Sequence, residues 1–106
     1  MEIKEVLEIV ELMKHKKSAV KHPLTVGQNY FIRTITHYYT GRLKEVVGQW
    51  LVLDDASWIA DTGRFHDFLK DGKCNEYESF IESVMVPIAS IIDVTIWKHG
   101  LFRGQK

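Results

Sequence analysis

The chain is poor in cysteine and lacks long apolar runs, and each of these features excludes some classes of protein. It has 106 residues with one cysteine, Cys74, so neither an internal disulfide nor a cysteine metal cluster can form. No apolar run approaches the length of a membrane span, and the charged residues 1–6 are unlike a secretory signal. These absences predict an intracellular, cytoplasmic protein that has no contact with a membrane.

The chain also lacks a net charge, since 14 basic residues balance 14 acidic ones. The total therefore gives no sign of nucleic-acid binding. The charges nevertheless fall in blocks: residues 12–53 hold seven basic residues and one acidic, while residues 54–93 hold nine acidic and three basic. If the blocks lie on different faces, they favour head-to-tail association. The alternative is that the charges are spread evenly over the surface.

What is present is the composition of one ordinary globular domain, with 45% hydrophobic and 26% charged residues. Apolar residues at helical spacing predict an N-terminal helix over residues 2–17, with residue 20 as its outer bound. These residues are Ile3, Val6, Leu7, Val10 and Met13. Pro23 ends any continuation of this helix.

Runs rich in β-branched and aromatic residues predict five short antiparallel strands, the first three joined by tight turns at Thr40–Gly41 and Gly48–Gln49. The strands are expected at Tyr30–Tyr39, Arg42–Val47, Trp50–Leu53, Ser83–Ile88 and Ile91–Trp97. Pro87 places the end of the fourth strand at an edge or a bend, and Ala89–Ser90 separates it from the fifth.

The stretch between the third and fourth strands is long, and it holds a short helical pattern. Phe65, Phe68 and Leu69 form an apolar face that Gly72 ends, and Asp61 or Thr62 is expected to cap it. Lys70–Ser79 is expected to be an exposed loop. The tail Lys98–Lys106 ends in glycine and charge, and we expect it to be loosely held.

The strand region holds two motifs, one formed by Gly41, Leu43, Val46, Leu51, Leu53 and Ala56 and the other by Ile88-Ala-Ser-Ile-Ile-Asp-Val94. In these two motifs it resembles the Sm-like family. The similarity covers Val26–Ala56 and Val84–Trp97. It implies a mainly β fold with α: an N-terminal helix followed by a five-stranded, strongly bent antiparallel barrel with a helical insertion. The single domain 1–106 then divides into helix 1–20, barrel 26–56 and 83–97, insertion 57–82 and tail 98–106.

The resemblance does not extend to the family's RNA pocket. Val47-Gly48-Gln49-Trp50 stands where RNA-contacting members usually carry aspartate and asparagine, and Pro87–Ser90 supplies no Arg-Gly or Lys-His pair. Thr36–Phe65 is also similar to small uncharacterised bacterial and phage proteins, and that similarity brings no activity with it.

No pattern of catalytic residues emerges. Asp54 and Asp55 are adjacent, so on a strand they point to opposite faces, and we expect them at a polar strand end that begins a turn. His66 and Asp67 diverge on a short helix, and Cys74 is expected to be an ordinary exposed thiol. Neither a HExxH motif nor a glycine-rich phosphate loop is present. We therefore expect no catalytic residues, no metal and no cofactor, so the protein is expected not to be an enzyme.

The aromatic residues are too numerous for a small barrel to enclose. We expect a ligand or partner surface that includes polar tips of the insertion, and its candidates are Trp58, Asp61, Arg64, His66, Tyr38, Tyr39 and Trp50.

The function that these features favour is a non-enzymatic module that forms a homo-oligomeric ring and holds a protein partner or a small ligand. The alternative is an RNA-binding ring. Its basic residues would be Lys16, Lys17, Lys21, Arg33 and Arg42, with Tyr38 and Tyr39 stacking on bases. A small enzyme is the third possibility.

Overall fold

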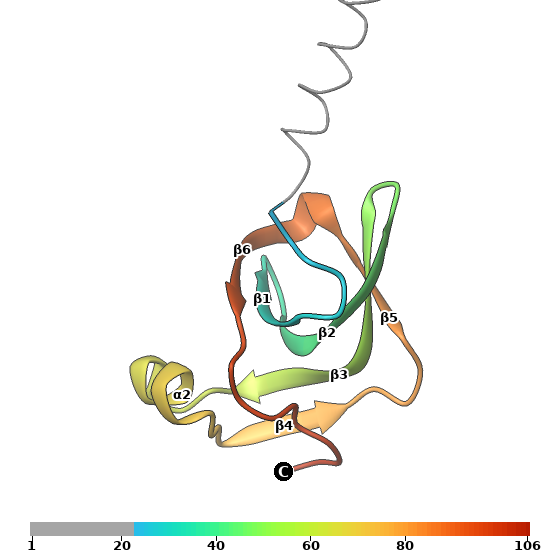
Figure 1. Cartoon of the computed structure of the whole chain (residues 1–106). Helices are drawn as coiled ribbons and strands as arrows, with labels where there is room; N and C mark the ends of the chain where they lie inside the picture. The colour runs from blue at the N-terminus through green and yellow to red at the C-terminus, as the bar shows by residue number, and fades with distance from the viewer. Residues whose placement is uncertain (1–22) are drawn as a thin grey trace, which may run out of the picture.

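The computed structural model describes residues 23–106, and the N-terminal helix expected over residues 1–20 lies outside them. The described part is mainly β with one α-helix, as the sequence predicts. Its elements are β1 (Asn29–Thr34), β2 (Tyr38–Val47), β3 (Trp50–Asp61), α2 (Phe65–Asp71), β4 (Glu76–Ser79), β5 (Val84–Pro87), the 3₁₀ turn η1 (Ile88–Ser90) and β6 (Ile91–Ile96). The six strands form one antiparallel sheet in the order β4-β3-β2-β1-β6, with β5 also paired to β3 (Figure 1).

The sheet curls because β3 has two partners. Its first part, Trp50–Leu53, pairs with β5, and its second part, Ser57–Asp61, pairs with β4. From β5 the chain passes through η1 into β6, which returns to pair with β1. β5 and β6 do not pair with each other, so the hydrogen-bonded path among the described strands is open.

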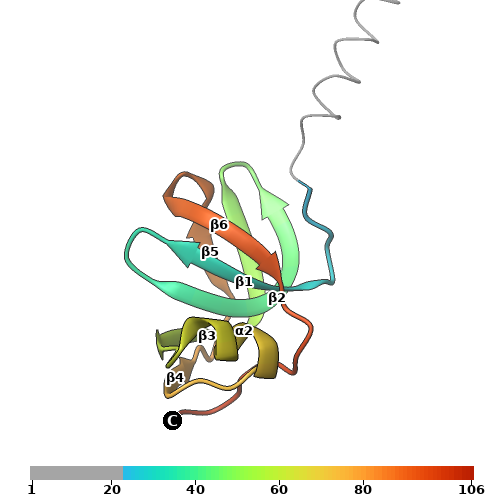
Figure 2. The ribbon, with the colours of Figure 1, turned by 90° about the vertical axis from the view of Figure 1, so that its left-hand side faces the viewer.

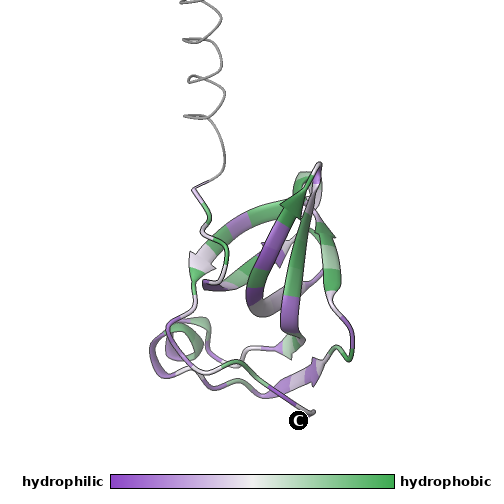
Figure 3. Ribbon diagram, turned by 45° about the vertical axis from the view of Figure 1, so that its right-hand side comes forward, coloured by the Kyte–Doolittle hydropathy of each residue, from purple (hydrophilic) through white to green (hydrophobic). Residues whose placement is uncertain are grey.

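Two hydrophobic cores lie on opposite faces of the same strands. Along the strands of Figure 3 the hydropathy changes from residue to residue, as expected when successive side chains point to opposite faces. The first core lies inside the curl and contains Tyr30, Ile32, Leu43, Leu51, Leu53, Ala56 and Val86. The second core packs α2 and the C-terminal residues against the other face (Figure 2), and it contains Phe31, Ile59, Phe68, Cys74 and Trp97.

The first turn lies earlier than the sequence indicates. The expected strand Tyr30–Tyr39 is split, because Thr34 donates its backbone N–H (2.8 Å) and its hydroxyl (2.7 Å) to the carbonyl of His37. Tyr38–Val47 is then one strand, and the turn expected at Thr40–Gly41 is wrong. Gly41 lies within β2, where a Cβ would be 3.2 Å from the Cβ atoms of Leu53 and Ala56.

The third strand is three times as long as expected, because it continues through Asp54 and Asp55 to Asp61. The two aspartates therefore do not begin a turn. Asp55 has φ 49°, in the left-handed region, and the register of β2 and β3 shifts between Thr40 and Arg42. This bulge bends β3 and lets its two parts pair with different strands. The boundary expected between barrel and insertion at Ala56 thus falls inside a strand.

The helix in the insertion is present with the expected end, since Gly72 follows it with φ 72° and donates its N–H to the carbonyl of Phe68. The expected caps are wrong: Arg64 is the N-cap residue and makes no side-chain cap bond. The loop expected at Lys70–Ser79 contains β4, so the sheet has six strands instead of five.

The predicted strands near the C-terminus agree with β5, η1 and β6, and Pro87 is the last residue of β5. The tail is not loosely held. Lys106 exchanges two backbone hydrogen bonds with Tyr77 (2.8 and 3.2 Å), and Ser79 donates to the carbonyl of Gly104 (2.8 Å). No helix of the described residues is long and apolar enough to cross a membrane.

Candidate functional site

Strand register places three residues side by side on one face of the sheet. Two of them, Tyr39 and Trp58, were predicted as site residues, and the third, Glu78, was not. Tyr39 of β2 pairs with Trp58 of β3, and Trp58 pairs with Glu78 of β4. Directly paired residues of antiparallel strands share a face, with Cβ atoms about 5 Å apart. We call Tyr39, Trp58 and Glu78 the aromatic row. Ile32, paired with Tyr39 on the other side, is fully buried, while Tyr39 and Trp58 are half-buried and Glu78 is exposed. The row therefore leads from the first core out to solvent.

Two further rings flank the aromatic row. His37 lies 5.9 Å from Trp58 and 6.2 Å from Tyr39, between ring centroids, and Phe80 lies 5.9 Å from Tyr39. Among the described residues, neither the Trp58 indole N–H nor the Tyr39 hydroxyl has a hydrogen-bond partner. The row therefore offers partly exposed rings and hydrogen-bond donors to a binding partner.

Tyr38 belongs to a different surface, because alternation turns it to the second core. Its ring meets Phe31 edge to face at 5.8 Å, and the guanidinium of Arg33 lies 5.9 Å from its centroid. The same guanidinium is 5.1 Å from the ring of Phe65 in α2. Tyr38 therefore packs with the second core, on the opposite face of the sheet from Tyr39.

Two ion pairs join the basic block of the sequence to the acidic block. Arg33 donates from Nε to Asp93 Oδ1 (2.8 Å) and from Nη2 to Oδ2, and Arg42 Nη2 donates to Asp55 Oδ2 (2.9 Å). The hydrogen bond from Arg33 lowers the pKa of Asp93, and the same hydrogen bond raises the pKa of Arg33. The two blocks are thus linked in the fold, and both arginines are engaged with carboxylates.

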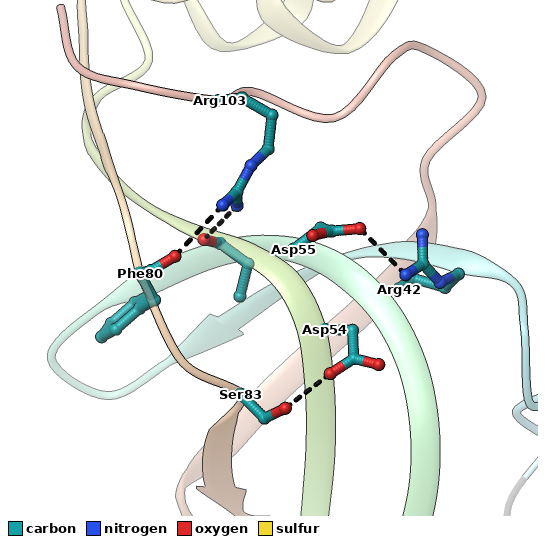
Figure 4. A network of polar contacts seen from close by, with 7 residues as sticks. Arg42, Asp54, Asp55, Phe80, Ser83 and Arg103 are labelled. Atoms are coloured by element: carbon teal, nitrogen blue, oxygen red, sulfur yellow. Dashed lines mark hydrogen bonds and ion pairs between the residues drawn. The ribbon is translucent and has the colours of Figure 1, made fainter.

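A polar network fixes the bend of β3 (Figure 4). Arg103 from the tail donates to the carbonyls of Ala56 and Phe80 (3.3 Å each), and Ser83 donates its hydroxyl to Asp54. Asp55 is held from the opposite direction by Arg42. The adjacent aspartates therefore point to different partners, and this geometry suits a structural bend more than shared proton transfer.

The polar tips of the insertion lie apart from the aromatic row. Asp61 accepts the N–H of Gly63 (2.8 Å) and lies 3.4 Å from the amide nitrogen of Asn75, so its carboxylate shapes the turn before α2. Arg64 lines a polar depression of about 260 Å³, and His66 is exposed on α2. None of these tips makes a hydrogen bond, an ion pair or a ring contact with Trp58.

Trp50, the remaining predicted surface residue, stands at the other end of β3 and is 46% exposed. It pairs with Pro87 of β5. The predicted surface residues thus fall into separate groups: the aromatic row, the second-core face, the insertion and the start of β3.

Among residues 23–106 there is no cluster of three or more metal-ligating side chains. Cys74 is 5% exposed, where an exposed thiol was expected, and burial raises its pKa. Its backbone carbonyl accepts a hydrogen bond from the Lys106 ammonium (2.9 Å). A thiol that is buried and held in its neutral form is poorly suited to nucleophilic attack.

Glu78, His37 and Phe80 were not predicted as site residues. Glu78 and Phe80 fall where a loop or an irregular stretch was expected, and His37 where a strand interior was expected. The alternation of Glu76-Tyr77-Glu78-Ser79 is the signal that indicates a half-buried strand there.

No family model matches the chain, and neither the curated proteins nor the solved structures contain a match to it.

Proposed function

We propose that this chain is a cytoplasmic, non-enzymatic, Sm-like barrel module that assembles with copies of itself into a closed ring and holds a protein partner or a small ligand. The observation that carries the proposal is a pair of open strand edges flanked by exposed apolar side chains. The barrel itself is supported by the curled sheet, in which the chain continues from β5 into β6 through η1.

The first open edge belongs to β5. Ile88, just after β5, donates its N–H to the carbonyl of Gln49 (2.9 Å), so the alternate residues Met85 and Pro87 point their backbone groups away from β3. Pro87 has no N–H to leave unpaired, which is where proline is tolerated on a strand. The side chain of Met85 is 63% exposed.

The second open edge belongs to β6. Trp97 donates its N–H to the carbonyl of Asn29 (2.9 Å), so the backbone groups of Val94 and Ile96 point away from β1. Ile92 and Ile96 are 62% and 52% exposed. No strand of the described residues covers either edge, whereas the tail covers the outer edge of β4.

Two different edges on one chain favour a head-to-tail contact, in which β5 of one copy pairs with β6 of the next. Such heterologous contacts give a ring when the rotation closes. An unpaired, apolar edge is otherwise a site of uncontrolled aggregation. Trp50, 46% exposed, pairs with Pro87 of β5 and would be covered by the same contact.

Light scattering coupled to size-exclusion chromatography tests the assembly across micromolar concentrations. The wild-type chain should elute as one closed oligomer, and Met85→Lys and Ile96→Lys should each give a smaller species, since a charge would face the contact. Ile81→Lys is the matched control, because Ile81 is 95% exposed between β4 and β5 and lies on neither open edge. A wild-type protein that is monomeric throughout would refute the ring.

RNA binding is the second candidate, and the aromatic row is the observation that favours it, since half-open rings can stack on bases. Arg33 and Arg42 are both paired with aspartates, which weakens this candidate. Binding of a uridine-rich oligomer that falls steeply with salt would support it. An oligomer that fails to bind even at low salt would exclude it.

A further inference from the structure

We infer that the aromatic row is a binding site for a lysine or arginine side chain presented by a basic segment of a partner protein. The cation lies over the faces of Trp58 and Tyr39, and its charge meets the carboxylate of Glu78. This inference rests on the partner-binding part of the proposed function and is independent of the ring.

The first reason is the geometry of the row. Tyr39, Trp58 and Glu78 are consecutive partners on β2, β3 and β4, so the two rings and the carboxylate follow one another across the sheet. Aromatic faces attract a cation placed within about 6 Å of the ring centroid, with tryptophan the strongest. A long basic side chain laid across the sheet can place its methylene groups on the rings and its charge at Glu78.

The second reason is the charge around the row. Glu76, Glu78 and Glu82 are all exposed on or just after β4, and none forms an ion pair among the described residues. Arg103 is nearby, but it donates to the carbonyls of Ala56 and Phe80 at the bend. His37 is the remaining titratable neighbour, and it lies against the rings themselves.

The third reason is that a carboxylate in the row discriminates between partners. Phosphates of RNA would be repelled by Glu78 and its two neighbours, whereas a guanidinium or an ammonium is attracted. Both the ring faces and the acidic rim are therefore satisfied together by a basic peptide and not by a nucleic acid. A shallow depression of about 390 Å³ adjoins Glu78 and is lined also by Phe80, Ile81 and Arg103. Because Arg103 brings a positive charge there, the depression gives room for uncharged residues of the peptide, and the basic side chain lies on the row itself.

The test uses the full chain and a fluorescein-labelled nine-residue peptide in which three arginines are spaced by glycine and serine. Fluorescence anisotropy should show saturable binding that weakens with salt. A peptide with citrulline in place of arginine keeps the shape and loses the charge, and it should not bind. Trp58→Ala should weaken binding about 10-fold or more, and Glu78→Gln about 5-fold, as expected for loss of one cation–π contact or one charge pair.

Matched controls come from the same fold. Phe65→Ala removes a 38% exposed ring of α2, and Glu45→Gln neutralises an exposed carboxylate on β2; both should bind the peptide as wild type does. Trp58→Phe keeps a ring and should retain part of the affinity. If Trp58→Ala fails to fold by circular dichroism, Glu78→Gln and Trp58→Phe still decide the question.

The inference is overturned if the arginine peptide does not bind, if the citrulline peptide binds equally well, or if Glu78→Gln and Trp58→Ala bind like wild type. It is also overturned if a uridine-rich oligomer binds in a Trp58-dependent manner while the peptide does not. Light scattering on the same samples keeps the two proposals apart. A monomer that binds the peptide refutes only the ring, and a ring that does not bind it refutes only this inference.

Discussion

Two residues, Gly41 and Asp55, determine the path of the longest strand. Asp55 adopts the left-handed conformation that aspartate tolerates better than most residues, and Arg42 holds its carboxylate. Opposite the bulge, β2 can approach β3 closely only because Gly41 has no side chain. Without the left-handed residue Asp55 and the glycine at position 41, we expect β3 to run straight and to be unable to pair with both β4 and β5.

Gly41→Ala is therefore expected to destabilise the fold. The added Cβ would lie 3.2 Å from the Cβ atoms of Leu53 and Ala56, and both of these residues are fully buried in β3. Neither Cβ can rotate away from its backbone, so we expect a loss of about 1–3 kcal/mol, as for other overpacked sites. Urea unfolding of the wild type and the variant measures this difference in the free energy of unfolding.

Gly100→Ala provides the control for this measurement. No heavy atom lies within 4 Å of the Cβ position at Gly100, and its φ is not in the left-handed region. Its stability should stay within about 0.5 kcal/mol of wild type, the usual range for an exposed substitution. Equal stability of the two variants would show that the close approach at Gly41 is not needed for the bend.

At the scale of elements, the C-terminal residues act as the neighbour that β4 otherwise lacks. β4 pairs with β3 on one side only, and a bridge joins Glu78 to Gln105 on its other side. Phe102 lies 4.8 Å from the ring of Tyr77 and packs in the second core. Ser57, fully buried, donates to the carbonyl of Phe102 (2.7 Å), so the tail also satisfies a buried hydroxyl.

Removal of residues 104–106 should expose the outer edge of β4. The amides of Tyr77 and Ser79 donate to Lys106 and Gly104, and they should exchange with deuterium much faster in the shortened chain. The exposed edge should also promote concentration-dependent association. Gln105→Ala in the full chain is the control, because it preserves the backbone bonds. Unchanged protection of Tyr77 would show that the tail does not stabilise β4.

The elements that sequence patterns predicted well are those with local signals. Phe65, Phe68 and Gly72 define α2, and Pro87 with Ala89–Ser90 separates β5 from β6. The errors have two causes. Tyr30–Tyr39 is dense in strand formers throughout, so only the local bonds between Thr34 and His37 reveal the turn. β4 and the full length of β3, in contrast, depend on partners that are distant in the sequence.

The aromatic row was predicted in part for the same reason. Tyr39 and Trp58 stand out by residue type, and both were expected at a surface. Glu78 joins them only through the pairing of β4 with β3, which depends on the continuation of β3 past Asp55. The sequence could not reveal that continuation, because two adjacent aspartates usually mark a strand end or a turn.

On the scale of the whole molecule, the open edges and the aromatic row involve different strands or different parts of one strand. β5 pairs with Trp50–Leu53 of β3 and β6 pairs with β1, whereas the aromatic row includes Trp58 in the part of β3 that pairs with β4. We therefore expect assembly through the edges to leave the row accessible. A ring of this kind would present one copy of the row per subunit, which raises the avidity for a partner with repeated basic segments.

The two cores share β1, β2 and β3, so the insertion should unfold together with the rest of the sheet. Phe68 is fully buried in the second core, 4.9 Å from the ring of Phe31 and 4.7 Å from that of Trp97. Phe68→Ala should lower the free energy of unfolding by about 3–5 kcal/mol, the cost of a large cavity. Phe65→Ala, in the same helix but 38% exposed, should cost about 1 kcal/mol.

Unfolding of the wild type, followed by tryptophan fluorescence and by circular dichroism, should give coincident single transitions. Separate transitions in the double variant Trp50→Phe/Trp58→Phe, whose fluorescence comes from Trp97 alone, would show instead that α2 and the tail form a unit that melts independently of the first core.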